Sequence, residues 1–126
     1  MKQINAQNAP QAIGPYSHAV KTGSLLYCSG QTPINPLTMK IDAKTFREET
    51  IQVIENLRLV LQEEGLELEN IIKVNVFLTD MEMFTEMNTV YAHYFSEHKP
   101  ARTTVAVKGL PMNARIEIEC IAEYNN

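Results

Sequence analysis

The residues best suited to chemistry are an arginine and a glutamate in the last quarter of the chain. Arg102 begins a strand-like run, 102–107, and Glu119 lies within a second one, 115–124. Alternate residues of a strand point to opposite faces of a sheet. If the valines of the first run share a face with the isoleucines of the second, Arg102 and Glu119 share the other face. An arginine beside a carboxylate on a partly covered face can present its planar fork to a carboxylate ligand.

The short connection between these two runs predicts an antiparallel hairpin. A register that keeps the faces matched places Thr104 opposite Glu117 and Arg102 opposite Glu119, and a slip of two residues would serve equally well. The spacing alone is also compatible with a structural role, in which Arg102 and Glu119 form a solvent-exposed ion pair that contributes little to stability.

Length and charge narrow the classes of function. The chain has 126 residues and a net charge of −4, which fits one domain spanning residues 1–126. Lysines and arginines are scattered, so we expect no nucleic-acid partner. Residues 1–6 lack the apolar stretch of a secretory signal, and no apolar run is long enough to span a bilayer, so we expect no membrane partner.

Cysteines and histidines are too few and too dispersed for a metal centre. Cys28 and Cys120 lie in apolar runs and are typical of small buried side chains, which favours a reducing, cytoplasmic setting. His93 and His98 are five residues apart, which misses the spacing of one helix face. The sequence therefore predicts neither a metal nor another cofactor.

The order of the expected elements predicts an α+β fold. Strands are expected at 2–5, 17–21, 25–31 and 71–78, besides the two C-terminal runs, with a Gly23 turn between the second and the third. Apolar residues at helical spacing predict one helix from Phe46 to Leu61, ended by Gly65. They predict another that is capped by Asp80, runs through Phe95 and is ended by Pro100. Two such helices can cover one face of a sheet, and the polar other face then meets water or another subunit.

A strand end at Ser29-Gly30-Gln31 is a second candidate for ligand contact. Glycine allows a ligand to approach the backbone closely and leaves N–H groups free to donate. A bulge or a simple exit from the strand would explain the same residues. No strand–elbow–helix context surrounds Ser29, so a serine nucleophile is not expected.

Several segments, in order along nearly the whole chain, together resemble the RidA family of enamine/imine deaminases. They are Ala12-Ile-Gly-Pro-Tyr-Ser17, Ser29-Gly-Gln31 before a proline-containing loop, Asn88-Thr-Val-Tyr91, Pro100-Ala-Arg-Thr-Thr-Val105, Leu110-Pro111 and Ile116-Glu-Ile-Glu119. Each segment alone is weak evidence, whereas the ordered set is specific.

The resemblance implies a chorismate-mutase-like fold, with a mixed six-stranded sheet and two helices packed on one face. It also implies a homotrimer in which the sheets form a central barrel and the active sites lie between subunits. The implied reaction is hydrolysis of 2-enamino and 2-imino acids, such as 2-iminobutanoate and 2-iminopropanoate, to 2-oxo acids and ammonia. The expected partners are therefore identical subunits and small imino or 2-oxo acids.

The resemblance also assigns roles to particular residues. Arg102 matches the arginine that binds the substrate carboxylate, and Glu119 matches the glutamate that positions the attacking water. The matching pocket-lining positions are Tyr16, Ser29, Gly30 and Asn88. Many relatives carry a cysteine where this chain has Thr104, so a thiol role is excluded there, and Thr104 is expected to contribute through its backbone.

Two other functions remain open at this stage. The first is a regulatory module that binds 2-oxo acids in the same cleft without turnover. The second is cleavage of RNA as a translation inhibitor, an activity ascribed to some relatives. The acidic net charge argues against the second alternative.

Overall fold

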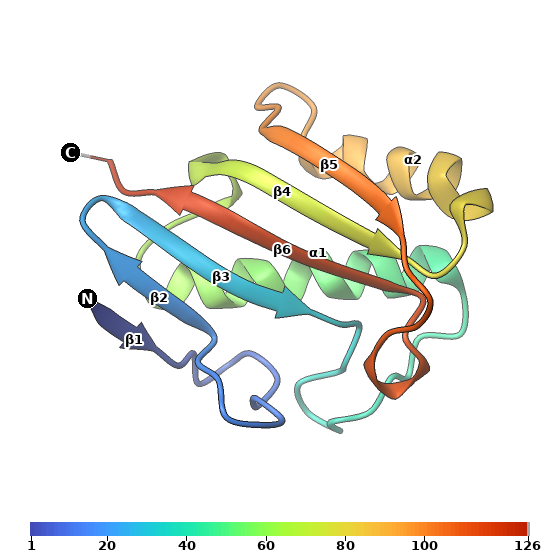
Figure 1. Cartoon of the computed structure of the whole chain (residues 1–126), viewed down its shortest axis with the longest axis horizontal. Helices are drawn as coiled ribbons and strands as arrows, with labels where there is room; N and C mark the ends of the chain where they lie inside the picture. Colours follow the sequence, from blue (N-terminus) through green and yellow to red (C-terminus); the bar gives the residue numbers. More distant parts are fainter. Residues whose placement is uncertain (126) are drawn as a thin grey trace.

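Two helices cover one face of a six-stranded sheet in the computed structural model, which describes residues 1–125 (Figure 1). The strands are β1 (Lys2–Ile4), β2 (Ala19–Thr22), β3 (Leu25–Gln31), β4 (Ile71–Leu78), β5 (Ala101–Ala106) and β6 (Ile116–Glu123). The helices are α1 (Phe46–Glu63) and α2 (Phe84–Tyr94), and short 3₁₀ turns lie at Leu68–Asn70, Met81–Met83 and Pro111–Asn113. The predicted α+β class, with a mixed sheet and both helices on one face, is confirmed.

Helix α1 begins and ends where its sequence indicates. The Thr45 side chain accepts a hydrogen bond from the Glu48 backbone N–H, which caps the first turn, and Gly65 has a φ of 69° just beyond the last turn. The apolar stripe of α1 packs on the sheet as the main core. Within the described residues, neither helix is both long enough and apolar enough to cross a bilayer.

The strand order corrects the predicted hairpin. The sheet runs β1-β2-β3-β6-β4-β5, in which β4 and β5 are parallel and every other pair is antiparallel. Helix α2 supplies the long connection that parallel strands require. The second run of the predicted hairpin, β6, lies between β3 and β4 and does not pair with β5. Ile116 and Ile118 of β6 are buried under the helices. In its inner position, the backbone groups of β6 form hydrogen bonds on both edges.

The predicted shared face of Arg102 and Glu119 is also wrong. Arg102 is aligned with Val74, which is buried beneath the helices, so its side chain lies on the helix face. Glu119 is aligned with Asn75 on the opposite face, which we call the open face because no helix covers it. Val105 belongs to the open face as well and is 41% exposed.

Candidate functional site

A β-bulge at the end of β3 opens the sheet at Ser29 and Gly30. The aligned pairs on either side are Cys28 with Cys120 and Gln31 with Ile118, so two residues of β3 stand opposite one residue of β6. Bulges of this kind bend a strand and re-aim its side chains, and they are frequent beside active sites. The expected strand exit at Ser29-Gly30 is therefore a bulge.

The bulge is fixed to the strand before it. The Ser29 N–H donates to the carbonyl of His18 at 2.9 Å, and its hydroxyl donates to the carbonyl of Ser17 at 2.7 Å. The proton of the Ser29 hydroxyl is thus committed to the protein, while its oxygen can still accept a hydrogen bond.

The side chain of Glu117 packs on Gly30 at the bulge. A Cβ at this position would lie 2.9 Å from Cδ of Glu117 and 3.2 Å from its Oε1. Any larger residue would displace the carboxylate. The sequence therefore brings a carboxylate against an open stretch of backbone, at the junction of β3 and β6.

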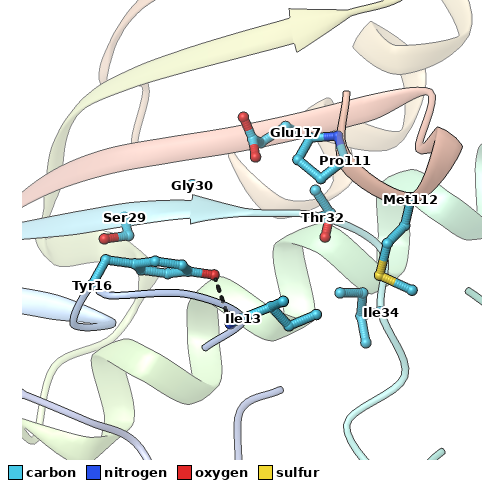
Figure 2. A pocket seen from close by; sticks show the side chains of 9 residues that line it. All are labelled: Ile13, Tyr16, Ser29, Gly30, Thr32, Ile34, Pro111, Met112 and Glu117. Atoms are coloured by element: carbon cyan, nitrogen blue, oxygen red, sulfur yellow. Dashed lines mark hydrogen bonds between the residues drawn. The ribbon is translucent and has the colours of Figure 1, made fainter. Parts of the chain in front are cut away.

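Glu117 lies at one side of a pocket of about 350 Å³ (Figure 2). Segments far apart in the sequence form this pocket: the loop before β2, the end of β3 with the loop that follows, and the start of β6 with the loop that precedes it. The lining residues are Ile13, Tyr16, Ser29, Gly30, Thr32, Ile34, Pro111, Met112 and Glu117. Ile13, Ile34 and Met112 make one wall apolar, while Glu117 and Tyr16 supply polar groups.

Tyr16 reaches the pocket through a tight turn. Gly14 has a φ of 125°, a conformation that glycine adopts without strain, and the Tyr16 ring lies against it. The Ile13 N–H donates to the Tyr16 hydroxyl oxygen at 3.3 Å (Figure 2). Because that contact uses only an oxygen lone pair, the Tyr16 proton remains available to a ligand.

The pocket favours a protonated Glu117 more than water does. Burial, followed by the nearby charge of Glu119, raises the pKa of Glu117 above its usual value. Glu119 itself accepts a hydrogen bond from the Asn75 amide at 3.0 Å and lies in a neighbouring hollow of the open face with Lys73. Within one chain, the carboxylate in the pocket is therefore Glu117, and the predicted Glu119 lies beside the pocket.

Sequence reasoning placed Glu117 on the same face as Glu119 but gave it no role. The role of Glu117 depends on its contact with Gly30 in the bulge, and these two residues are more than 80 positions apart in the sequence. Local sequence patterns do not reveal such a contact. Met112 and Pro111 were missed for the same reason. Met112 has a φ of 57°, which an isolated reading of its sequence does not indicate.

Arg102 lies in a different part of the molecule, which we call the arginine cluster (Arg102, Thr104 and the α2 residues beside them). Its guanidinium carbon lies 4.7 Å from the centre of the Tyr91 ring and 5.7 Å from that of Phe84, and Nη1 is 4.0 Å from the sulfur of Met87. Aromatic rings hold an arginine in place while leaving its donors free. Within residues 1–125, Arg102 forms no ion pair.

Two hydroxyl groups of the arginine cluster are buried and have no hydrogen-bond partner among the described residues. They belong to Thr104 and Tyr91. Unpaired buried polar groups are uncommon and call for an explanation, such as a ligand or a second chain. Thr104 thus brings its side chain as well as its backbone to this region. Asn88 follows Met87 on α2 and is half-buried.

The predicted site residues thus form two groups, and Glu119 belongs to neither of them. Tyr16, Ser29 and Gly30 line the pocket that contains Glu117, whereas Arg102, Thr104 and Asn88 belong to β5 and α2. Glu117 lies on the open face and Arg102 on the helix face, so one chain does not bring them together.

Comparison with known proteins identifies the family. The family model described as Endoribonuclease L-PSP matches residues 6–124. A RutC family protein of Pyrococcus horikoshii is 49% identical over 119 residues, which cover 94% of each chain. A Rid family protein of Yersinia pestis, YyfA, has a structure with a TM-score of 0.93 and 41% identity, covering 97% of this chain and 98% of its own.

A third relative was crystallised with a small molecule. TdcF of E. coli, whose structure contains bound serine, has a TM-score of 0.93 and 39% identity, covering 99% of this chain and all of its own. Matches of this extent and identity concern the whole fold. The chain therefore belongs to the Endoribonuclease L-PSP family, which confirms the expected place in the RidA family.

Proposed function

We propose that this chain hydrolyses reactive 2-enamino and 2-imino acids, such as 2-iminobutanoate and 2-iminopropanoate, to 2-oxo acids and ammonia. The observation that carries the proposal is the half-buried Glu117 carboxylate, whose pKa is raised and which faces a pocket with a free Tyr16 hydroxyl. Such a carboxylate can exchange protons closer to neutral pH than an ordinary glutamate. The serine bound to TdcF has the carboxylate and α-nitrogen of a 2-imino acid, which supports the same substrate class.

The reaction needs few protein groups because an iminium carbon is already electrophilic. Glu117 takes a proton from water as the water oxygen bonds to that carbon, which gives a carbinolamine. Glu117 then gives this proton to the nitrogen. The C–N bond breaks and ammonia leaves as Glu117 takes the proton of the carbinolamine hydroxyl and the C=O bond forms. The Tyr16 hydroxyl donates a hydrogen bond to the substrate or to the attacking water. No covalent intermediate with the protein is required.

Arg102 is the proposed anchor of the substrate carboxylate. Its fork can donate two parallel N–H bonds, and the unpaired Thr104 hydroxyl beside it can donate a third. Since Arg102 and Glu117 lie on opposite faces of one chain, we propose that the pocket of one subunit meets the arginine cluster of another. Tyr27 is 46% exposed and Val105 41% exposed on the open face, which suits contact with a second copy. We propose that the assembly is a homotrimer, as the family resemblance implies.

A coupled assay tests the reaction. Threonine or serine dehydratase generates the imine in place, and the rate of 2-oxo acid and ammonia formation is followed with and without this protein. We expect acceleration over spontaneous hydrolysis. Binding of 2-oxo acids with no acceleration would instead establish the regulatory module. The chain without the dehydratase serves as the control.

Mixing two impaired variants tests the shared site. Glu117→Gln and Arg102→Lys subunits are unfolded together, refolded as mixed oligomers and assayed. If each site takes Glu117 from one subunit and Arg102 from another, random mixing restores both residues in about a quarter of the sites. If each chain holds a whole site, every site keeps one defect and the mixture is no more active than the two variants assayed separately.

RNA cleavage is the second candidate, and it is favoured by the description of the matching family and by the description of a similar structure from Thermotoga maritima as an endoribonuclease. The net charge is −4 and the pocket contains a carboxylate, both of which repel a phosphate backbone. Incubation of a labelled RNA with wild type and with Glu117→Gln separates the two activities. We expect no cleavage that depends on Glu117.

A further inference from the structure

We infer that two buried polar side chains outside the pocket, Asn56 and His18, set its shape, each holding one of the loops that form its apolar wall. Neither of them lines the pocket, so both are positioning residues. The inference deepens the proposed function and, as far as catalysis is concerned, rests on it.

Asn56 joins helix α1 to the loop after β3. It is fully buried, and its amide nitrogen donates to the carbonyl of Thr32 at 3.1 Å and to that of Ile34 at 2.8 Å. Its amide oxygen accepts from the side chain of Gln52 at 2.9 Å. Both N–H groups of the Asn56 amide thus donate to carbonyls of the same loop.

The backbone hydrogen bonds of this loop lie within the loop itself: the Ile34 N–H donates to the Thr32 carbonyl and the Asn35 N–H to that of Lys40, both at 2.8 Å. Pro33 and Pro36 have no backbone N–H, and the segment lies beyond the last strand pair of β3. Buried carbonyls require a partner, and Asn56 is the partner for two of them. Because Thr32 and Ile34 both line the pocket, Asn56 fixes that wall from behind.

His18 has the corresponding role in the loop before β2. The ring is 3% exposed, its Nδ1 accepts from the Ala6 N–H at 2.9 Å, and its Nε2 contacts the carbonyl of Pro10 at 2.8 Å. A carbonyl can only accept, so Nε2 is the donor in this contact. The ring therefore closes the loop from Ala6 to Pro10 against the start of β2.

The loop held by His18 continues directly into another part of the pocket lining. Ile13 and Tyr16 follow Pro10, and the segment is fastened again where Ser29 bonds to Ser17 and His18. With both ends fixed, the turn carrying Tyr16 has little freedom. Loss of the His18 bonds would release the upstream end alone.

A positioning role has a specific kinetic signature. The walls contact the substrate side chain in the ground state and in the transition state alike, and Glu117 is held separately by β6. Loosening the wall held by Asn56 should therefore raise KM by about 10-fold while kcat changes by less than about 2-fold. Loosening the turn held by His18 should raise KM and also lower kcat, because that turn carries Tyr16. A purely structural role would lower the melting temperature and leave KM of the folded protein unchanged.

The Asn56 test uses three variants. Asn56→Leu keeps the volume and removes the amide. Gln52→Ala removes only the support of that amide and decides the matter if Asn56→Leu does not fold. Asn70→Leu is the control, since Asn70 also bonds a backbone carbonyl and an N–H, those of Glu123 and Glu67, away from the pocket.

We expect KM for the imine to rise in Asn56→Leu, less so in Gln52→Ala, and not in Asn70→Leu. Hydrogen exchange at the Ile34 amide, which bonds to Thr32, should quicken in the first two variants only. An unchanged KM and unchanged exchange in the folded Asn56→Leu and Gln52→Ala proteins would overturn the inference, as would an equal rise in the control.

The His18 test uses the conservative variant. Gln places a donor near the position of Nε2, so His18→Gln should keep part of the Pro10 bond and should show a lower KM than His18→Leu. Exchange at the Ile13 amide, which bonds to Tyr16, should follow the same order. If His18→Gln and His18→Leu both had the KM and the Ile13 amide exchange of wild type, His18 would not position this loop.

The exchange measurements also separate this inference from the proposed reaction. A wild type without deaminase activity would remove the proposed function. Faster exchange at the Ile34 and Ile13 amides in the variants would still establish that Asn56 and His18 hold the loops. Unchanged exchange beside normal wild-type activity would overturn the inference alone.

Discussion

The Glu117 pocket and the arginine cluster are assembled in opposite ways. The pocket gathers residues from three segments that span most of the chain, whereas the cluster belongs to the continuous unit β4-α2-β5. The pocket contains Glu117 of the uncovered sheet face, and the cluster packs against the aromatic rings of α2. The groups proposed for proton transfer and for carboxylate binding are thus kept apart in a single chain.

The two regions also differ in charge. Glu117 has another carboxylate nearby, and Arg102 has aromatic rings and a thioether around it. Among the described residues, neither forms an ion pair. Each therefore has charge left to offer to a ligand or a second chain. The predictions below separate the contributions of the two regions, in order of expected size.

The largest effect is expected at Glu117. Glu117→Gln keeps the volume and removes the basic group, so kcat for imine hydrolysis should fall by about 10²-fold or more. Glu119→Gln is the matched control, and the coupled dehydratase assay should show at most a small loss, because Glu119 lies outside the pocket. The reverse order would return the role of base to Glu119, as the sequence alone predicts.

A smaller loss is expected at Arg102. Lysine keeps the charge but has no fork, so Arg102→Lys should lower kcat/KM by about 10- to 100-fold, the scale of one charge-assisted hydrogen bond. Arg58→Lys is the control, since Arg58 also lies over a tyrosine ring but faces Glu55 on the helices. Wild-type rates in Arg102→Lys, with an unchanged oligomer, would leave Arg102 a structural residue.

Gly30 tests the contact between bulge and carboxylate. The added methyl group of Gly30→Ala would lie 2.9 Å from Glu117 Cδ, so the carboxylate must shift. We expect kcat to fall by about 10-fold, because misplaced catalytic groups lose rate steeply. Gly109→Ala has open space around its Cβ and should be silent. Equal activity of both variants would show that the placement of Glu117 tolerates change.

The smallest effect concerns stability and pH. The pKa of Glu117 is raised in the folded protein, so folding favours its protonated form. That stabilisation is fully present below the pKa of the unfolded chain and is lost as pH rises through the folded-state pKa. Urea unfolding should therefore show wild type losing stability relative to Glu117→Gln across this range. A constant difference at all pH values would contradict the assigned shift.

Local features of the sequence predicted the elements well. The spacing from Phe46 to Leu61 located α1, and Asp80 does cap the turn that leads into α2. The Gly23 turn between β2 and β3 was also located. These signals are short-range, because capping, helical periodicity and turn conformation depend on residues a few positions apart.

Strand pairing could not be read in the same way. The alternation within β5 and β6 was correct, but it does not say which strand is the neighbour or which set of residues faces the helices. Val105 looked like a core residue and is exposed, while Arg102 looked exposed and packs under α2. The aromatic rings of Phe84 and Tyr91 on α2 contact the guanidinium of Arg102. The pattern of β5 alone cannot indicate this contact, because the rings belong to another element.

The place of β6 in the sheet has a consequence for how the molecule comes into being. β6 is the last strand along the chain, yet it supplies every hydrogen-bonded link between β1-β2-β3 and β4-β5. Before β6 is synthesised, β1-β2-β3 and β4-β5 therefore cannot pair into one sheet. The edges of β3 and β4 lack hydrogen-bond partners at that stage, and such edges are prone to wrong association. Residues 116–123 join the pieces and deliver Glu117 in the same event. Joining of the sheet and completion of the pocket are thus one step, and a nascent chain has no pocket until that step occurs.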